Sequence, residues 1–154
     1  ESVRQPLEGS SIRMLEAKDL DALDSLLHEF SPRWHHDVTF KVRVDGPGCV
    51  VGLFVGDSLA GFALTQWSST KEPISGAVWR NALGEHWGSS GPIGVSETYR
   101  GKGHGDALLA GALMTLKNRG VRQCIIDWTT LLGYYGKHGF QPSRTYHQAS
   151  LKLD

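Results

Sequence analysis

Three glycines and two cationic residues stand directly in front of an apolar run in the segment YRGKGHGDALL, residues 99–109. The first backbone N–H groups of a helix have no partner within the helix, and the helix dipole favours negative charge there. Glycine lets the backbone approach a bulky phosphate and adopt a positive φ. The spacing therefore predicts a phosphate site with Arg100 and Lys102 at its mouth. The alternative is a tight turn that needs glycine only for its backbone.

Two common phosphate motifs do not fit this loop. The dinucleotide fingerprint G-x-G-x-x-G requires a third glycine where the sequence has Asp106 or Leu108, depending on the starting glycine. The P-loop requires Ser or Thr after its Gly-Lys pair, and the sequence has Gly103 there. The pattern that fits is R-x-x-G-x-G, formed by Arg100, Gly103 and Gly105.

Other reactive residue types form no recognised motif. The seven histidines do not form H-E-x-x-H, and adjacent His35 and His36 would point apart on a helix, so we expect no metal. GSSGP comes near the nucleophile elbow G-x-S-x-G, but Pro92 stands where its last glycine should be. Cys49 and Cys124 fit neither C-x-x-C nor a disulfide framework. They predict two buried thiols in a reducing, cytoplasmic compartment.

The composition is that of one globular domain. The 154 residues are 40% hydrophobic and 21% charged, which suffices for a proper core. The formal net charge of zero argues against a broad nucleic-acid surface. No apolar run approaches the ~18 residues that a membrane span needs. The chain begins at Glu1 rather than methionine, which predicts a trimmed chain or a domain of a longer protein.

The first half of the chain predicts one helix and three strands after a lead-in segment, residues 1–10. Leucines at helical spacing predict a helix over 18–30, which Pro32 ends, and residues 32–38 are expected to form a helical turn or a loop. A hairpin turn at Gly56-Asp57 separates two apolar runs. The strands are expected at residues 11–15, 49–55 and 58–67.

The second half places the glycine loop between a strand and a helix. The strand at 86–95 is interrupted by Gly91 and Pro92, which predicts a bulge or a splayed edge. The helix after the loop is expected from Gly105 to about Arg119. A buried strand at 123–128, a short helix at 131–138 and a last alternating strand at 144–153 complete the single domain, residues 11–154.

Two segments together resemble the GNAT superfamily of acyl-CoA-dependent N-acetyltransferases. IGVSETYRGKGHGDALL, residues 93–109, is similar to the first signature of that family, and WTTLLGYYGKHGF, residues 128–140, to the second. One helix and one strand separate them, as in the family, and the resemblance covers about residues 11–153. The sequence departs from the family pattern at four positions, which are Glu97, His104, Trp128 and Leu131.

The resemblance implies a fold and a cosubstrate. The fold is α/β (α+β), with a mixed, mostly antiparallel sheet of about six to seven strands, a splayed fourth strand and about four flanking helices. The cosubstrate is acetyl-CoA: the amide of Val95 would pair with the pantetheine arm, and the amide of Ile93 would face the thioester carbonyl. The complete expected cofactor-binding set is Ile93, Gly94, Val95, Arg100, Gly101, Lys102, Gly103, His104, Gly105 and Asp106.

The resemblance also implies two catalytic residues. Tyr135 aligns with the general acid that protonates the departing CoA thiolate; the alternative is an amphipathic core residue like Tyr134. Many relatives carry a glutamate on the fourth strand, where this chain has serines. The candidates for the general base are Asp127, Glu85, His86 and a water chain. We choose Asp127, for which a substrate-binding or capping role is an equal alternative.

The acceptor site is expected to hold aromatic residues beside carboxylates, which suits a small-molecule amine with a flat or cyclic apolar face, such as an amino sugar or an aryl amine. The expected acceptor-binding residues are Trp34, Asp37, Trp87 and Trp128. Residues 127–146 also resemble the acetyltransferase-like domains attached to some amino-sugar glycosidases.

The sequence therefore predicts an N-acetyltransferase that acts by direct attack in a ternary complex, with no nucleic-acid or membrane partner. The alternative is a non-catalytic acyl-CoA-binding module of a larger protein. A homodimer and a covalently linked partner domain are both left open.

Overall fold

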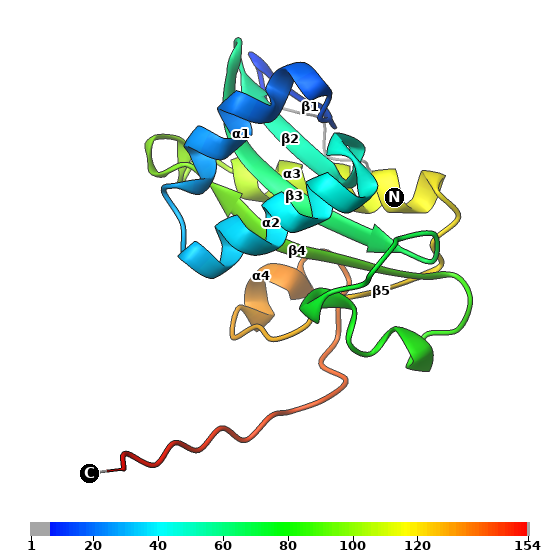
Figure 1. The fold of residues 1–154 in the computed structure, drawn as a ribbon. Helices are drawn as coiled ribbons and strands as arrows, with labels where there is room; N and C mark the ends of the chain where they lie inside the picture. The colour runs from blue at the N-terminus through cyan, green and yellow to red at the C-terminus, as the bar shows by residue number, and fades with distance from the viewer. Residues whose placement is uncertain (1–6, 154) are drawn as a thin grey trace.

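The computed structural model describes residues 7–153, and six residues of the expected lead-in segment lie outside that range. Five strands form one sheet in chain order (Figure 1). All neighbouring strands are antiparallel except β4 and β5, which are parallel. The strands are β1 (Ser10–Met14), β2 (Val50–Val55), β3 (Ser58–Trp67), β4 (Trp87–Val95) and β5 (Gln123–Ile125). The predicted fold class, a mixed and mostly antiparallel sheet, is confirmed.

Residues 7–153 form four α-helices, the number that was expected. They are α1 (Leu20–Leu27), α2 (Pro32–Asp45), α3 (His104–Asn118) and α4 (Leu132–Gly136). Figure 1 shows α1 and α2 in front of the sheet and α3 behind it. The predicted start of α3 at the end of the glycine loop is confirmed to within one residue. None of the helices within residues 7–153 is both long enough and apolar enough to cross a membrane.

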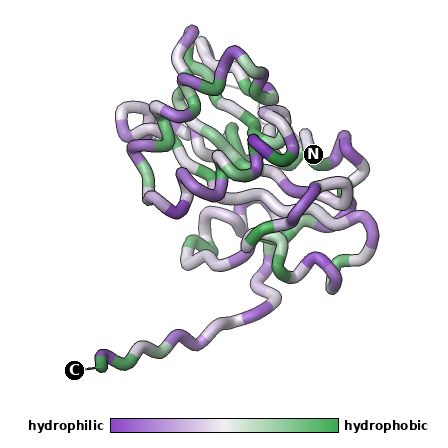
Figure 2. The backbone as a smooth tube through the Cα atoms, in the orientation of Figure 1, coloured by the Kyte–Doolittle hydropathy of each residue, from purple (hydrophilic) through white to green (hydrophobic). Residues whose placement is uncertain are grey.

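The central strands are apolar on both faces because a helix layer covers each face. Val50, Phe62 and Leu64 pack with the leucines of α1. Val51 and Ala63, their neighbours along the strands, point the other way and pack with α3. Alternate side chains of a strand point to opposite faces, so burial of both faces requires an unbroken apolar run. Figure 2 shows these hydrophobic runs inside the fold and hydrophilic residues along the outer helices.

Residues 32–45 form a full helix, so the expectation of a turn or loop at 32–38 was wrong. Pro32 ends no helix here but occupies the first turn of α2, where its missing N–H is tolerated. The hydroxyl of Ser31 caps the helix by accepting from the Trp34 amide at 3.3 Å. Lys41 masks the amphipathic pattern, because it is buried with its ammonium 2.6 Å from Asp45 Oδ2.

The expected last strand at 144–153 was also wrong, and the sheet has five strands rather than six or seven. Beyond Phe140 the described chain has no regular secondary structure. Leu151 and Leu153 are each 82% exposed. Figure 1 shows this segment leaving the domain. Alternation predicts a strand only where a sheet edge is available to pair with it, and β5 ends at Ile125 instead of reaching residue 128.

Candidate active site

The fourth strand separates from the fifth after three residues. Parallel pairing joins only Trp87, Gly88 and Ser89 to β5. On the other side of β4, Ser90 pairs with Thr65 and Ile93 with Ala63, so Gly91 and Pro92 together face one residue of β3. The predicted bulge and splay at Gly91-Pro92 are therefore confirmed. The second half of β4 has lost its β5 neighbour, and a cleft opens there.

This cleft has a volume of about 820 Å³. One wall is the open half of β4, and a second is the segment that follows β5. The other walls come from α2, from α4, from the loop between β3 and β4, and from Arg100 and Gly105 beside the glycine loop. The walls carry apolar, aromatic and carboxylate side chains together. An elongated, partly polar ligand fits such a lining.

The glycine loop lies beyond the open end of β4 and leads into α3. Gly101 has φ 75° and Gly103 has φ 82°, so both occupy the left-handed region that favours glycine. Gly103 is the N-cap of α3. A Cβ at Gly101 would meet no atom within 4 Å, which leaves open space above the loop. Residues 101–103 are exposed. This geometry can accommodate a phosphate at the N-terminus of a 15-residue helix.

Arg100 and His104 flank the loop in different ways. Arg100 is exposed, and its Nε donates to the carbonyl oxygen of Val95 at 2.9 Å, which ties the loop to the end of β4. His104 is buried, with its ring edge-on to Tyr99 at 6.2 Å between centroids. Its Nδ1 has no hydrogen-bond partner among the described residues. The imidazole therefore points into the protein, and only the His104 amide remains available to an anion.

The two tyrosines of α4 are placed differently. The Tyr134 hydroxyl donates to the carbonyl oxygen of Gly105 at 2.7 Å, which fixes α4 against the first turn of α3. Tyr135 is 8% exposed, lines the cleft, and packs edge-on to Phe140 at 5.9 Å. Burial raises the pKa of Tyr135, so its phenol stays protonated at neutral pH and can act as an acid.

Asp127 lies in the segment after β5, on the wall opposite β4. Its Oδ1 accepts a hydrogen bond of 2.8 Å from the hydroxyl of Tyr146. Trp79 donates in turn to that hydroxyl through its indole N–H. The ring of Trp128 stacks on Tyr146 at 5.4 Å and is 66% exposed. The C-terminal segment thus holds Asp127 in place through one tyrosine.

The acceptor residues predicted on α2 line the cleft. Trp34 stacks on Phe30 at 5.6 Å, so one face of its ring belongs to the core. Asp37 lies one turn further along α2, with its Oδ2 3.9 Å from Nε of Arg33. Trp87 lies elsewhere: it is buried at the closed end of β4, where it pairs with Gln123.

Residues 13–140 match the family model described as the acetyltransferase (GNAT) family. The chain belongs to this family. The match covers both segments on which the sequence resemblance rests. No curated protein matches the chain at a significant level.

Solved structures of acetyltransferases share the GNAT fold seen here. A glucosamine N-acetyltransferase region of a fungal multi-domain GH3 β-N-acetylglucosaminidase matches with a TM-score of 0.78 and 22% identity, over 84% of this chain and 16% of that one. Glucosamine-6-phosphate N-acetyltransferase from Arabidopsis thaliana matches with a TM-score of 0.60 and 20% identity, over 96% and 100%. AAC(6')-Iy, bound to the bisubstrate analogue CoA-S-monomethyl-acetylneamine, matches with a TM-score of 0.64 and 16% identity, over 94% and 99%. At these identities the likeness concerns the fold alone.

The GNAT fold brings most of the predicted site residues to one place. Those that line the cleft are Trp34, Asp37, Ile93, Gly94, Val95, Arg100, Gly105, Asp127, Trp128 and Tyr135. Those that do not are Trp87, Gly101, Lys102, Gly103, His104 and Asp106. Apart from Trp87, the second group forms the loop and first turn next to the cleft. The roles of all sixteen residues stay predictions.

Several residues that line the cleft of this GNAT domain were not predicted from the sequence. Ser75 and Gly76 come from the loop between β3 and β4, where no periodicity or motif signals a site. A Cβ on Gly76 would lie 3.0 Å from the Ser89 hydroxyl, so glycine lets this loop pack closely against β4. Tyr134 could have been predicted, because it stands next to Tyr135 in the second signature. The cleft lining also includes Arg33, Ser90, Thr129, Thr130 and Leu131.

Proposed function

We propose that this GNAT domain transfers the acetyl group of acetyl-CoA directly to a primary amine of a small molecule. The observation that carries the proposal is the opened half of β4. It forms a cleft that continues from the glycine loop at the start of α3 to the buried Tyr135. An acyl-CoA has the same order of parts, a pyrophosphate, an extended arm and a reactive end.

Three sets of backbone amides would bind acetyl-CoA. The amides from Gly101 to Gly105 hold the pyrophosphate, because the helix N-terminus favours negative charge. The amide of Val95 pairs with the pantetheine arm. The amide of Ile93 donates to the thioester oxygen as negative charge develops on it, a contribution of about 2.7–4 kcal/mol for one such donor.

The transfer requires the nitrogen to lose two protons and the departing thiolate to gain one. The amine arrives as an ammonium, and Asp127 takes its first proton directly or through water and releases it to solvent. The amine nitrogen then bonds to the thioester carbon, the carbon–sulfur bond breaks, and the thiolate takes the proton of Tyr135. The second proton of the nitrogen, lost as the amide forms, returns to the Tyr135 oxygen. A Tyr135 phenol kept neutral by burial is in the correct state for this step.

We propose direct transfer without an acyl-cysteine intermediate. Burial raises the pKa of both Cys49 and Cys124 to about 12, so neither is a thiolate at neutral pH. Neither cysteine is among the residues that line the cleft. Two free thiols also support a reducing, cytoplasmic location as part of the proposal.

For the acceptor we favour an amino sugar. Trp34 and Trp128 offer ring faces to the apolar side of a sugar, and the carboxylates of Asp37 and Asp127 suit an ammonium. Two of the structural neighbours carry glucosamine or its 6-phosphate in their names. The fungal neighbour is a multi-domain protein, and this chain spans 16% of its length. A linked partner domain that completes the acceptor site agrees with that comparison.

The direct test is calorimetric titration with acetyl-CoA, CoA and adenosine, followed by an assay against amino sugars and aryl amines. We expect saturable binding that needs the pantetheine and pyrophosphate, and release of free CoA only with an accepted amine. Absence of acetyl-CoA binding would overturn the proposal.

A second candidate is a non-catalytic acyl-CoA-binding module. The composition of β4 favours this candidate. The strand contributes Ser90 to the cleft and has no acidic residue of its own. Among residues 7–153, the carboxylates that line the cleft are those of Asp37 and Asp127. Tight acetyl-CoA binding without turnover of any amine in the panel would favour this module over the enzyme.

A further inference from the structure

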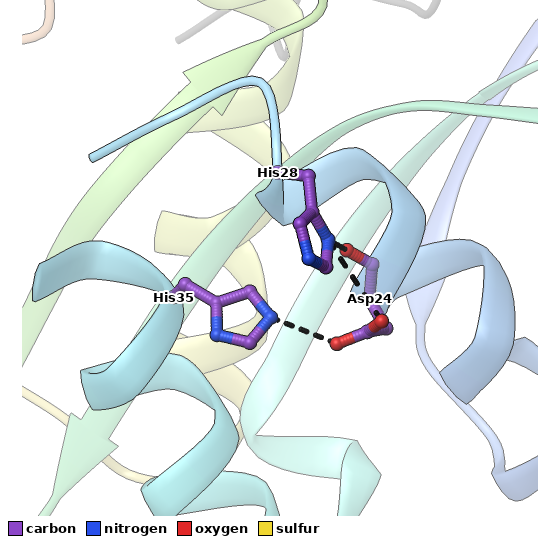
Figure 3. A group of neighbouring side chains, drawn as sticks. All are labelled: Asp24, His28 and His35. Atoms are coloured by element: carbon purple, nitrogen blue, oxygen red, sulfur yellow. Dashed lines mark hydrogen bonds and ion pairs between the residues drawn. The ribbon is translucent and has the colours of Figure 1, made fainter. Parts of the chain in front are cut away.

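Two histidines and an aspartate meet on the outer side of the hairpin formed by α1 and α2. Asp24 lies on α1, His28 is the residue that ends α1, and His35 lies in the first turn of α2. One ligand atom from each lies within 4.8 Å of the other two. Figure 3 shows both imidazoles turned toward the Asp24 carboxylate. Within residues 7–153 no other three His, Cys, Asp or Glu side chains meet in this way.

We propose that Asp24, His28 and His35 bind a divalent transition metal ion of the zinc class. Imidazole nitrogen and carboxylate oxygen are ligands that such ions prefer. This site is separate from the acetyl-transfer cleft and does not depend on the proposed function.

The hydrogen bonds prepare His28 to act as a ligand. Its Nδ1 lies 2.7 Å from the backbone carbonyl oxygen of Asp24. A carbonyl oxygen can only accept, so this contact requires the proton on Nδ1, and in the neutral ring Nε2 is the nitrogen with a lone pair for an ion. Metal-binding histidines typically donate their other N–H to a backbone carbonyl or a carboxylate, which fixes the ring. Asp24 and His28 are also four residues apart on one helix, a spacing that places both on one face.

His35 completes the set from the second helix. Its Nε2 lies 2.8 Å from Asp24 Oδ1, and its ring is edge-on to His28 at 4.8 Å between centroids. An ion that bonds at ~2.1 Å to each ligand holds tetrahedral ligand atoms ~3.4 Å apart. The ion would replace the proton shared by His35 and Asp24, and that proton leaves to solvent. The side chains would rotate to bring the ligand atoms from within 4.8 Å of one another to this spacing.

The three side chains are accessible to an ion from solvent. The exposed fractions are 69% for His28, 59% for Asp24 and 32% for His35. Water can therefore supply the remaining ligands. A bound ion would fasten the end of α1 to the first turn of α2. Trp34 and Asp37 extend from that part of α2 into the cleft, so the ion would steady one of its walls.

The test is a titration of the untagged chain with zinc chloride by calorimetry, with a parallel cobalt(II) titration followed by visible absorption. We expect one ion per chain and tetrahedral cobalt bands. At a free zinc concentration of 100 Kd, the Tm should rise by about 5–10 °C.

The variants His28→Gln, His35→Gln and Asp24→Asn should each weaken zinc binding by at least about tenfold. Their metal-free Tm values report that they fold. His36→Gln, an exposed neighbour on α2, is the matched control and should bind as the unchanged chain does. Two results would overturn the proposal. One is the absence of saturable zinc binding, which leaves an ordinary ion pair. The other is equal binding by the three variants and the control.

Discussion

The hydroxyl of Tyr134 donates to the carbonyl oxygen of Gly105 at 2.7 Å, which joins the two signature segments of the chain. One segment contains the glycine loop that we propose binds phosphate, and the other contains the neighbouring Tyr135. Tyr134 therefore fixes the position of α4, and Tyr135 is left to face the cleft. We therefore expect the two adjacent tyrosines to have separable roles, Tyr134 in stability and Tyr135 in the proposed chemistry.

Replacing Tyr135 with phenylalanine tests the proposed acid. The variant Tyr135→Phe should lower kcat by about 10²-fold or more, because the thiolate loses its proton donor. Acetyl-CoA affinity should not change. Tyr134→Phe is the contrast: it loses a hydrogen bond to a carbonyl and should lower the free energy of unfolding by about 1 kcal/mol. Steady-state kinetics, calorimetry and urea unfolding separate the two. A normal kcat in Tyr135→Phe would remove the tyrosine from the mechanism.

A negative charge in the glycine loop should weaken binding of acetyl-CoA. Gly103→Asp places a carboxylate beside the expected pyrophosphate and should raise Kd by about tenfold or more. Gly103→Asn is the matched control, since Asn and Asp both tolerate the left-handed φ of 82° found here. Calorimetry measures both. If Asp and Asn bind equally well, the pyrophosphate lies elsewhere.

Variants at Asp127 and Tyr146 distinguish the proposed proton acceptor from the residue that positions it. Asp127→Asn should lower kcat/KM by about 10²-fold or more if the carboxylate takes the proton of the amine. Tyr146→Phe keeps the carboxylate and removes only its 2.8 Å hydrogen bond, so the loss should be smaller. The ratio of the two effects, from kcat/KM for the best amine, decides the role. Full activity in Asp127→Asn would contradict this role and leave Glu85, His86 or a water chain as the candidate general base.

Stability at acid pH should depend on Asp19. Its carboxylate takes two hydrogen bonds from Arg13, at 2.7 and 2.9 Å, which lower its pKa from 3.8 to about 2. Because the folded state has the lower pKa, this stabilisation is present above about pH 4 and is lost as the pH falls toward 2.

Urea unfolding of Asp19→Asn checks this expectation. The variant should be less stable than the unchanged chain by about 1–2 kcal/mol at pH 7, and the difference should shrink as the pH approaches 2. A difference that stays constant between pH 7 and pH 2.5 would show that the pair does not titrate in this way.

Most of the features that were predicted correctly depend on residue types within short segments of the sequence. Positive φ at Gly101 and Gly103 and the splay at Gly91-Pro92 follow from residue types whose backbone preferences are strong. The extent of α2 was missed because Ser31 and Pro32 can end one helix or begin another, and only packing decides between them. The last strand was missed because a strand needs a neighbour, which the alternation of residues 144–153 cannot supply.

Contacts between residues far apart in the sequence could not be predicted, for a different reason. Asp24 and His35 are 11 residues apart and meet only because α1 and α2 fold back on each other. Asp127 and Tyr146 are 19 residues apart, with α4 and a loop between them. Such pairs depend on the angle between helices and the course of loops, which a single sequence does not specify. The two signatures succeeded because each is a continuous segment.

The break in pairing at Ser89 divides β4 into two halves with different tolerance to change. Gly88 and Ser89 are paired with strands on both sides, so replacements there should lower expression and thermal stability. Ile93 and Val95 are held on the β3 side only, and replacements there should spare the fold while altering ligand occupancy. A saturation mutagenesis map scored separately for abundance and for acetyl-CoA retention should therefore change character between residues 89 and 93 of one continuous strand.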